Sequence, residues 1–466
     1  MGRISEAACQ ESDLYFLPIF WTLEENTSRS IRMPRRPKVD PETALKDQIA
    51  KLSVDLPAKL LKDLAKSAKF SLRKRKIEPA LFFWNLILGF GASMQKTLAA
   101  LKKRYCIIAA EDLVPSSFYE RFNNRLVPYL QAILQHLLAT TVRSEMPQKI
   151  LGSFKDVLIF DSTIVRLLDT LASLFPGAGM PAGVKIATIL SVATDNLYQM
   201  AFYKGKHADV KTLKLGKWIK NHLLLFDLGY FKYAVFEKIQ RLGGHYITRL
   251  HGNANPKIIS VNQTYRGRSI NLVGKKIRDC LNLLDRGVID AMVEVSVKRR
   301  PYRGKRSPVP LVMRLVGILN EETGEYHLYL TDLPVETFTP EHIAELYRGR
   351  WCVELLFKEL KSRYALDVIS TGNPEIVKAL IYTAMILLVV SRKLFVGYRD
   401  AMARGGHLIT KERWARFLVE YSGLVLREIL KESKIKFTEE TLLNMALHET
   451  VAPDPLRERL DDVWDM

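Results

Sequence analysis

Cysteine is scarce in this sequence, and its four residues form no C-x-x-C motif: Cys9, Cys106, Cys280 and Cys352. Thiols scattered in this way are typical of neither a disulfide framework nor a zinc site. They fit a reducing compartment, where disulfides rarely persist. The sequence therefore predicts a protein whose stability does not depend on cysteine cross-links.

Long apolar runs are also absent. The longest, Ala379–Val390, has 12 residues, which is too short to span a bilayer and predicts a buried core helix. Residues 1–32 show no basic segment followed by an apolar one, so no secretory signal is apparent. We expect a cytoplasmic protein with no membrane partner.

Acidic residues are outnumbered by basic ones. The chain of 466 residues has 70 Lys and Arg against 50 Asp and Glu, a net charge of +20. A globular chain this basic usually binds a polyanion, and nucleic acid is the first candidate. A generally basic proteome is the alternative. Hydrophobic residues make up 48%, which argues against wholesale disorder and allows two or three domains.

The residue pattern changes along the chain from helical to mixed and back to helical. Residues 41–150 have apolar residues at helical spacing, and residues 338–450 do so again. Between them the pattern predicts three strands, a helix, a strand, a helix and a strand, at 156–161, 184–195, 197–206, 207–220, 222–227, 231–244 and 245–250. Residues 251–335 are β-rich. The sequence therefore predicts an α/β fold between two all-helical regions.

Two aspartates end short apolar strands. Asp161 closes "DVLIFD" and Asp227 closes "HLLLFD", and ligand-binding acids collect at strand ends in α/β sheets. A carboxylate buried there needs a compensating partner, and divalent cations such as Mg²⁺ prefer oxygen ligands. The alternative for each aspartate is a cap on the following turn or helix. His207 with Asp209, in "GKHADV", is interpreted as a helix cap, and a pair that supports the metal ligands is the alternative.

One stripe of a helix predicted over Tyr347–Lys361 carries a single acid, Glu354, among cations. At about 100° per residue, one narrow stripe collects Tyr347, Arg350, Glu354 and Lys361, with Lys358 beside it. The apolar residues crowd another arc, which should hold the helix against the sheet. We expect Trp351 to pack under this helix. A single acid among bases suggests a metal ligand flanked by phosphate-binding residues; a solvated charged face is the alternative.

The spacing Y-x2-R-x3-E-x6-K in this helix resembles the signature of DDE transposases of the insertion-sequence-4 family. "FDST" at Phe160–Thr163 and "DLGYF" at Asp227–Phe231 resemble the blocks around the first two acids of that family. The resemblance covers roughly residues 50–430. It implies a ribonuclease-H-like mixed sheet with a β-rich insertion, preceded and followed by all-helical regions.

The resemblance also implies a division of the chain. The segments are, in order, an extension that is a candidate for disorder (1–37), a helical DNA-binding domain (38–150), a first part of the ribonuclease-H-like core with both aspartates (151–250), the β-rich insertion (251–335), a second part of the core with the glutamate helix (336–395), and a C-terminal helical region for DNA binding or dimerisation (396–466).

In activity, the resemblance implies cut-and-paste transposition of an insertion sequence, by strand cleavage and strand transfer at terminal inverted repeats. Asp161, Asp227 and Glu354 would be the catalytic residues and would hold two Mg²⁺ ions, which Mn²⁺ can replace. No small-molecule cofactor is implied. The implied partners are double-stranded DNA, as transposon ends and as target, and a second copy in a homodimer on that DNA, at the nucleoid.

Several cations are candidates for binding DNA phosphates. By resemblance, Tyr347, Arg350 and Lys361 would grip phosphates beside the scissile bond. Lys358 and Arg249 are weaker candidates for the same task.

Two basic segments outside this helix are further candidates. "LRKRK" contains Arg73, Lys74, Arg75 and Lys76 and suggests a phosphate-binding corner, with a solvated charge run as the alternative. "KRRPYRGKR" contains Arg299, Arg300 and Tyr302. Some relatives hold a flipped base with an aromatic in the insertion, often Trp. No Trp lies between residues 252 and 340 here, so Tyr302 is the candidate, with an ordinary hairpin tip as the alternative.

Three other functions remain open from the sequence. Another ribonuclease-H-like nuclease, such as a junction resolvase, would share the sheet and the acids. A catalytically silent DNA-binding descendant would share the charge. An unrelated basic α/β protein would match the spacing by coincidence.

Overall fold

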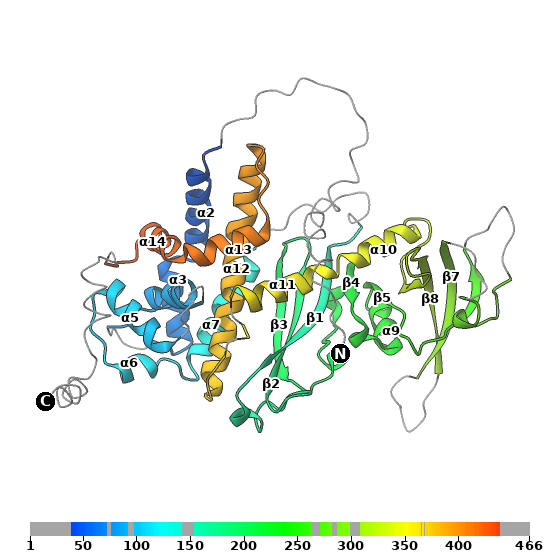
Figure 1. Ribbon diagram of the computed structural model, residues 1–466, viewed down its shortest axis with the longest axis horizontal. Helices are drawn as coiled ribbons and strands as arrows, with labels where there is room; N and C mark the ends of the chain where they lie inside the picture. Colours follow the sequence, from blue (N-terminus) through cyan, green and yellow to red (C-terminus); the bar gives the residue numbers. More distant parts are fainter. Residues whose placement is uncertain are drawn as a thin grey trace, which may run out of the picture.

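The computed structural model describes residues 39–71, 76–91, 97–141, 153–262, 271–281, 287–298, 308–364, 366–367 and 369–438. The chain forms an elongated molecule, with a body of helices at one end and a long mixed sheet at the other (Figure 1). Several predicted DNA-binding residues lie outside the described residues, namely Arg73, Lys74, Arg75, Arg299, Arg300 and Tyr302.

Helices from both ends of the chain build the helical body. The first group comprises α2 (Pro41–Asp55), α3 (Ala58–Ser67), α4 (Pro79–Trp84), the π-helical turn η4 (Asn85–Gly91), α5 (Leu98–Ala109), α6 (Pro115–Tyr119) and α7 (Leu126–Ala139). The second comprises α12 (Pro374–Arg404), α13 (Lys411–Glu420) and α14 (Ser422–Glu432). Because α12 contacts α2 and α7, and α14 contacts α2, the two groups share one core.

Helix α12 is the central element of that body. Among the described residues it is the one helix long and apolar enough to cross a membrane, but 78% of its most apolar stretch is buried inside the protein. Its apolar residues therefore pack against other helices. The buried core helix predicted at Ala379–Val390 is confirmed, and Asn373 caps its start by accepting from the backbone N–H of Glu375 at 2.9 Å.

The strands form a single nine-stranded sheet in the order β3-β2-β1-β4-β5-β9-β8-β7-β6. The strands are β1 (Asp156–Arg166), β2 (Gly183–Ser191), β3 (Asn196–Lys204), β4 (His222–Phe226), β5 (His245–Arg249), β6 (Lys257–Val261), β7 (Val288–Lys298), β8 (Pro308–Leu319) and β9 (Tyr326–Thr331). β4 is parallel to both β1 and β5, and the other pairs are antiparallel. The predicted ribonuclease-H-like fold class is confirmed by this topology.

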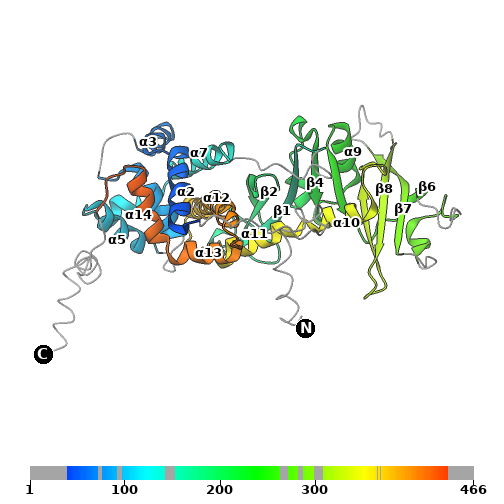
Figure 2. The same cartoon turned by 90° about the horizontal axis from the view of Figure 1, so that it is seen from above.

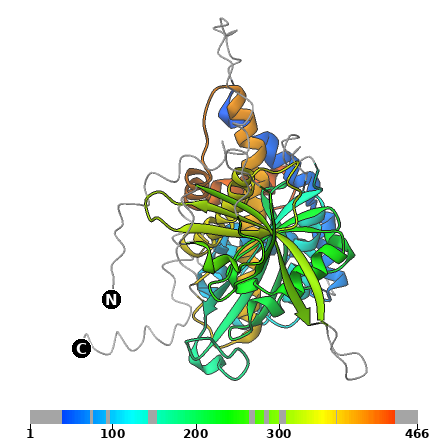
Figure 3. The same ribbon diagram turned by 90° about the vertical axis from the view of Figure 1, so that its right-hand side faces the viewer.

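The β-rich insertion extends the same sheet rather than standing apart from it. β9 pairs with β5 through the residue pairs Ile247–Thr331, Thr248–Leu330 and Arg249–Tyr329. β8, β7 and β6 follow outward, and the whole sheet twists along its length (Figure 3). The insertion is thereby hydrogen-bonded to the strand next to β4.

The two faces of the sheet are covered by different elements. Alternation along β1 sends Val157 and Ile159 to one face and Leu158 and Phe160 to the other. The first face is covered by α10 (Pro340–Arg348) and α11 (Trp351–Ser362), and the second by α9 (Tyr233–Arg241). Figure 2 shows α9 on one side of the sheet and the α10–α11 pair on the other.

One predicted helix is wrong. Residues 207–220 contain only two short 3₁₀ turns, η6 (Asp209–Lys211) and η7 (Lys217–Ile219). Lys211, Lys214 and Lys217 would repel one another at the i, i+3 spacing of a helix, and Gly216 weakens helix formation further. The segment therefore crosses the face of the sheet opposite α11 as an extended connection from β3 to β4.

The helix predicted over Tyr347–Lys361 is two helices. α10 ends at Arg348 and α11 begins at Trp351, and the junction is tightened by bonds three residues apart, such as Arg350 N–H to Tyr347 O at 3.0 Å. The apolar arc packs inward as predicted: Leu346, Val353, Leu356, Phe357 and Leu360 are buried. The prediction for Trp351 is wrong, because its side chain is 45% exposed at the start of α11.

Candidate active site

The register of the sheet brings the two predicted aspartates level with each other. β1 and β4 are parallel, and Phe160 pairs with Phe226, so Asp161 and Asp227 are the next residues on adjacent strands, about 5 Å apart in backbone position. Alternation puts Asp161 on the face that carries Val157 and Ile159, which is the face covered by α11. Asp227 directly follows β4 and precedes the 3₁₀ turn η8 (Leu228–Tyr230).

The third predicted acid reaches this edge from α11. Figure 1 shows α10 and α11 in line across the sheet, and α11 contacts β1. Arg350, at the junction of the two helices, lies between two of the acids. It donates from Nη2 to Glu354 Oε1 at 2.5 Å, and its Nη1 lies 3.8 Å from Asp161 Oδ2. The guanidinium thus occupies the position of a cation between the carboxylates of Asp161 and Glu354.

The pKa of Asp161 is raised by its surroundings in the site. Burial raises the pKa of the Asp161 carboxyl to about 6, and the negative charges of Asp227 and Glu354 also raise it. The Ser162 N–H and the Arg350 guanidinium act in the opposite sense. Arg350 Nε has no hydrogen-bond partner among the described residues. The acids are therefore only partly compensated by the protein itself.

Tyr347 closes the site from α10. Its side chain is buried, and its hydroxyl donates to Phe226 O at 3.2 Å, one residue before Asp227. Burial raises the pKa of this hydroxyl to about 12. The Arg350 guanidinium lies 5.9 Å from the centre of its ring. The described contact of Tyr347 is thus with the strand end that carries Asp227, and binding to a phosphate remains a prediction.

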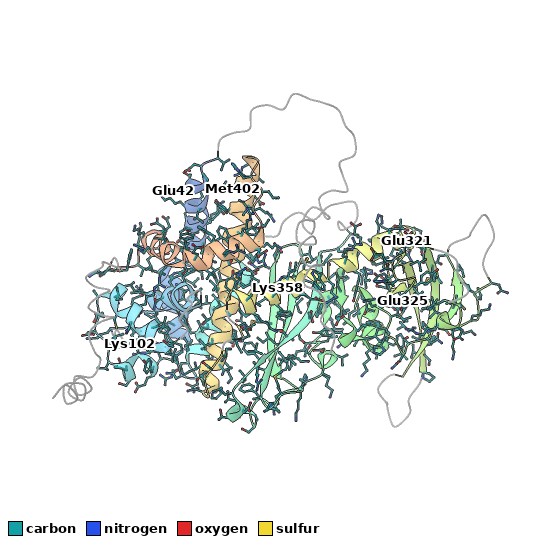
Figure 4. The ribbon with its side chains drawn as sticks, viewed as in Figure 1. Glu42, Lys102, Glu321, Glu325, Lys358 and Met402 are labelled. Carbon is teal, nitrogen blue, oxygen red and sulfur yellow. The ribbon has the colours of Figure 1, made fainter. Side chains whose placement is uncertain are left out.

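The remaining predicted cations are spread over three places. Lys358 is exposed on α11, between the sheet and the helical body (Figure 4), and Lys361 is half-buried in the last turn of α11. Arg249 is exposed at the end of β5. Lys76 lies in the helical body, where it donates to Asp112 O at 3.1 Å and pairs with Glu111 at 3.7 Å. Among the predicted cations that the structure describes, Arg350 is the one with an ion pair to Asp161 and Glu354.

The donor set suits a hard divalent cation, although its present arrangement is not closed around one. Asp161, Asp227 and Glu354 offer only carboxylate oxygens, the ligands preferred by Mg²⁺ and Mn²⁺. Over the described ranges, no group of three or more His, Cys, Asp or Glu side chains is close enough to hold a metal ion. The bond from Arg350 to Glu354 gives a reason, since Glu354 would have to exchange the guanidinium for a metal.

A second polar cluster lies behind the aspartates, around Asp209, and its partners Ser162 and Lys185 were not predicted from the sequence. Ser162 Oγ and Lys185 Nζ both donate to Asp209 Oδ1, at 2.5 and 2.6 Å. The cap expected at Asp209 is wrong, because Asp209 begins the turn η6 without a side-chain cap bond and its carboxylate is turned toward strands β1 and β2. A signal was available in the sequence, since Asp209 is the one acid among six lysines from Lys204 to Lys220.

Comparison with known proteins gives the family. The family described as "Transposase DDE domain" matches residues 152–390, which is 239 of the 466 residues. The chain belongs to this family. It is a DDE transposase, an enzyme that cleaves DNA, and members of the family use divalent metal ions. The matched range contains Asp161, Asp227 and Glu354 as well as the insertion.

Curated relatives of this DDE transposase carry the same kind of name. The transposase for insertion sequence element IS231F of Bacillus thuringiensis subsp. israelensis is 24% identical over 371 residues, covering 70% of this chain and 75% of the relative. The transposase for IS1151 of Clostridium perfringens is 23% identical over 364 residues, covering 70% and 76%. A putative transposase, InsL of IS186A from Escherichia coli (strain K12), is 38% identical over 73 residues, covering 16% and 20%.

Among solved structures, a piggyBac transposase synaptic complex with hairpin DNA aligns over 93% of this chain and 92% of that one. The identity is 12% and the TM-score is 0.40. A likeness at this level adds nothing to the family assignment.

Proposed function

We propose that this DDE transposase moves an insertion sequence by cut-and-paste transposition, with Asp161, Asp227 and Glu354 as its catalytic carboxylates. The observation that carries the proposal is the register of β1 and β4. It sets Asp161 and Asp227 side by side at the face where α11 presents Glu354. Residues far apart in the sequence thereby supply three oxygen-donor side chains to one edge of the sheet.

Two Mg²⁺ ions, or Mn²⁺ in their place, would be held by these three carboxylates and would supply activation of the attacking hydroxyl and stabilisation of the leaving oxygen. Asp161 and Glu354 would release Arg350 when the site is loaded. Arg350 would then be free to bind a DNA phosphate beside the scissile bond, as a bidentate donor. Lys358 and Lys361, about two and three turns beyond Arg350, would extend this contact along the DNA backbone.

The proposed DNA partners are inferred from the relatives and not from the geometry. We assign terminal inverted repeats and target DNA as substrates, because the relatives are transposases of insertion sequences. Two ends must be cut together, so a homodimer assembled on DNA is part of the proposal, as is action at the cytoplasmic nucleoid. The helical body would bind DNA outside the cleavage site, in keeping with the charge of +20.

The first experiment is nicking of supercoiled plasmid by the full chain with Mg²⁺ or Mn²⁺. Glu354→Gln is expected to lower the nicking rate by roughly two orders of magnitude or more, because it removes the ligand charge at constant shape. DNA affinity, measured by fluorescence anisotropy, should stay within about twofold, since phosphate contacts dominate it.

Glu341→Gln is the matched control, because Glu341 is exposed in the first turn of the neighbouring helix α10. It is expected to nick as the unchanged protein does. Equal nicking by Glu354→Gln and Glu341→Gln would remove Glu354 from the catalytic set. Metal-dependent nicking without strand transfer of inverted-repeat ends would indicate a nuclease of another kind, such as a junction resolvase.

A further inference from the structure

Asp209 occupies a position behind the catalytic aspartates, on the opposite face of the sheet. It lies on the connection from β3 to β4, which crosses the face covered by α9 rather than by α11. Its Oδ1 accepts hydrogen bonds from Ser162 Oγ at 2.5 Å and from Lys185 Nζ at 2.6 Å. Through this one carboxylate oxygen, the β3–β4 connection is hydrogen-bonded to both β1 and β2.

Ser162 links this cluster to Asp161. The two residues are consecutive on β1, so their side chains point to opposite faces. The Ser162 backbone N–H donates to Asp161 Oδ1 at 2.7 Å. The same residue thus holds the catalytic carboxylate on the front of the sheet and is held by Asp209 at the back. The direction in which Asp161 points depends on how Ser162 is fixed.

The other side of Asp209 faces the turn that follows Asp227. Gly229 lies so close that a methyl group added there would be 3.0 Å from Asp209 Oδ2. Tyr230, the next residue, is buried in the turn η8, which packs against η6. Thr212 donates to Asp209 O at 2.7 Å, which closes the turn η6. Asp209 therefore touches the segments that carry both catalytic aspartates.

The charge balance argues that Asp209 acts through these neighbours and not as a metal ligand. Lys185 is only 6% exposed and neutralises the carboxylate directly. Replacing that partner by a metal would leave a buried ammonium uncompensated, which is costly. The other lysines of the connection, Lys204, Lys206, Lys211, Lys214, Lys217 and Lys220, are exposed. Asp209 is thus the acid that is turned inward from a basic surface segment.

We infer that Asp209 is a positioning residue, which sets the relative placement of Asp161 and Asp227 by holding Ser162 and the 228–230 turn from behind the sheet. The inference rests on the proposed metal-binding role of the two aspartates. Groups that orient metal ligands through hydrogen bonds change metal affinity by 10- to 100-fold when they are removed. Since Asp209 acts through Ser162, the residue next to Asp161, and through Gly229, which follows Asp227 after one residue, we expect an effect near the lower end of that range.

The test is to measure Mn²⁺ binding to the DNA-free full chain by isothermal titration calorimetry. Asp209→Asn keeps the shape and removes the charge, and should raise the Mn²⁺ dissociation constant roughly tenfold. Ser162→Ala removes one hydrogen bond and leaves the Lys185 pair, so it should raise the constant less, about threefold. Because the two changes affect one contact, the double variant should show less than the product of the two effects.

Asp169→Asn is the matched control. Asp169 also begins a three-residue 3₁₀ turn that follows a strand, but it is exposed, so its Mn²⁺ affinity should equal that of the unchanged protein. Melting temperatures measured alongside separate positioning from folding. If Asp209→Asn and Ser162→Ala lower the melting temperature while the Mn²⁺ constant stays unchanged, Asp209 is merely structural and the inference is overturned.

The two levels of the argument fail differently. Absence of specific Mn²⁺ binding by the unchanged protein, with Asp161→Asn giving the same titration, would overturn the proposed metal site and the inference with it. Binding by the unchanged protein that is lost in Asp161→Asn and unaffected in Asp209→Asn would leave the proposed function standing and overturn the inference alone.

Discussion

Arg314 and Arg350 both bind carboxylates on the face of the sheet beneath α10 and α11, yet their surroundings differ. Arg314 and Asp290 are each 1% exposed and form two hydrogen bonds, at 2.9 and 2.6 Å. The remaining nitrogen of Arg314 donates to Phe338 O at 2.7 Å, just before α10. Arg350 is 14% exposed, its Nε has no partner in the described part of the chain, and it lies among three acids.

The difference separates a structural ion pair from a binding site. In the first pair, donors and acceptors match, so nothing is left for a ligand to satisfy. Around Arg350, one cation faces the three carboxylates of Asp161, Glu354 and the nearby Asp227, so negative charge is in excess. Excess charge in a partly buried position is what a metal ion or a further cation would compensate.

The largest expected change in the free energy of unfolding comes from removing one partner of the buried Arg314–Asp290 pair. Arg314→Met should lower the free energy of unfolding by about 3–5 kcal/mol, because Asp290 would stay buried without its partner. Urea denaturation measures the change. The matched substitution Arg350→Met should cost only about 1 kcal/mol, since the acids there retain contact with water. Equal losses in the two variants would contradict the distinction between the pairs.

The next effect comes from relieving the charge excess. Asp161→Asn should raise the free energy of unfolding of the metal-free protein at pH 8, by on the order of 2 kcal/mol. The pKa of Asp161 is raised from 3.8 to about 6 on folding, so its ionisation destabilises the folded state above pH 6. The gain should therefore fade as pH falls from about 6 to about 4. Urea titrations across this range measure it, and a gain that is constant with pH would contradict the assignment.

The smallest expected change in the free energy of unfolding concerns the partly exposed pair of His245 and Asp332. His245 Nδ1 lies 3.0 Å from Asp332 Oδ2, with the two side chains 36% and 13% exposed. The hydrogen bond to Asp332 raises the pKa of His245 above 6.5. The stabilisation is fully present below pH 6.5 and is lost as pH rises through the raised pKa. His245→Gln should cost less than about 1 kcal/mol at pH 6 and less still at pH 9. His407→Gln, at an exposed site after α12, is the control and should show no such pH dependence.

The parts of the site that the sequence predicts are those written in local patterns. Asp227 follows the apolar strand β4 as predicted, and Asp161 follows an apolar run, although β1 continues past it to Arg166 and the predicted strand end at Asp161 is wrong. The buried arc of α11 is visible as helical spacing. The meeting of the two aspartates depends on parallel pairing of β1 and β4, which only the family resemblance implied. The residues alone therefore predicted the α/β fold and the separate acids, and the resemblance predicted that the acids meet.

The parts that escaped prediction depend on contacts across the sheet. Local spacing made 207–220 look helical, while Asp209 is held by strands that lie outside that segment. Arg350 looked like a free phosphate binder, yet in the fold it is paired with Glu354. Trp351 was expected to pack under the helix, but it starts α11 at the helix junction and is exposed. No local pattern encodes such partners.

The pairing of β5 with β9 has a consequence for how this lineage can change. The chain leaves the core at Arg249 and returns at Tyr329, and these two residues are partners in the sheet. Leu250 N–H also donates to Leu328 O at 2.8 Å. The two ends of the insertion are thus hydrogen-bonded to each other, whatever length of chain lies between them. Evolution can lengthen, shorten or rebuild the outer strands while the path from Asp227 to Glu354 keeps the same endpoints in space.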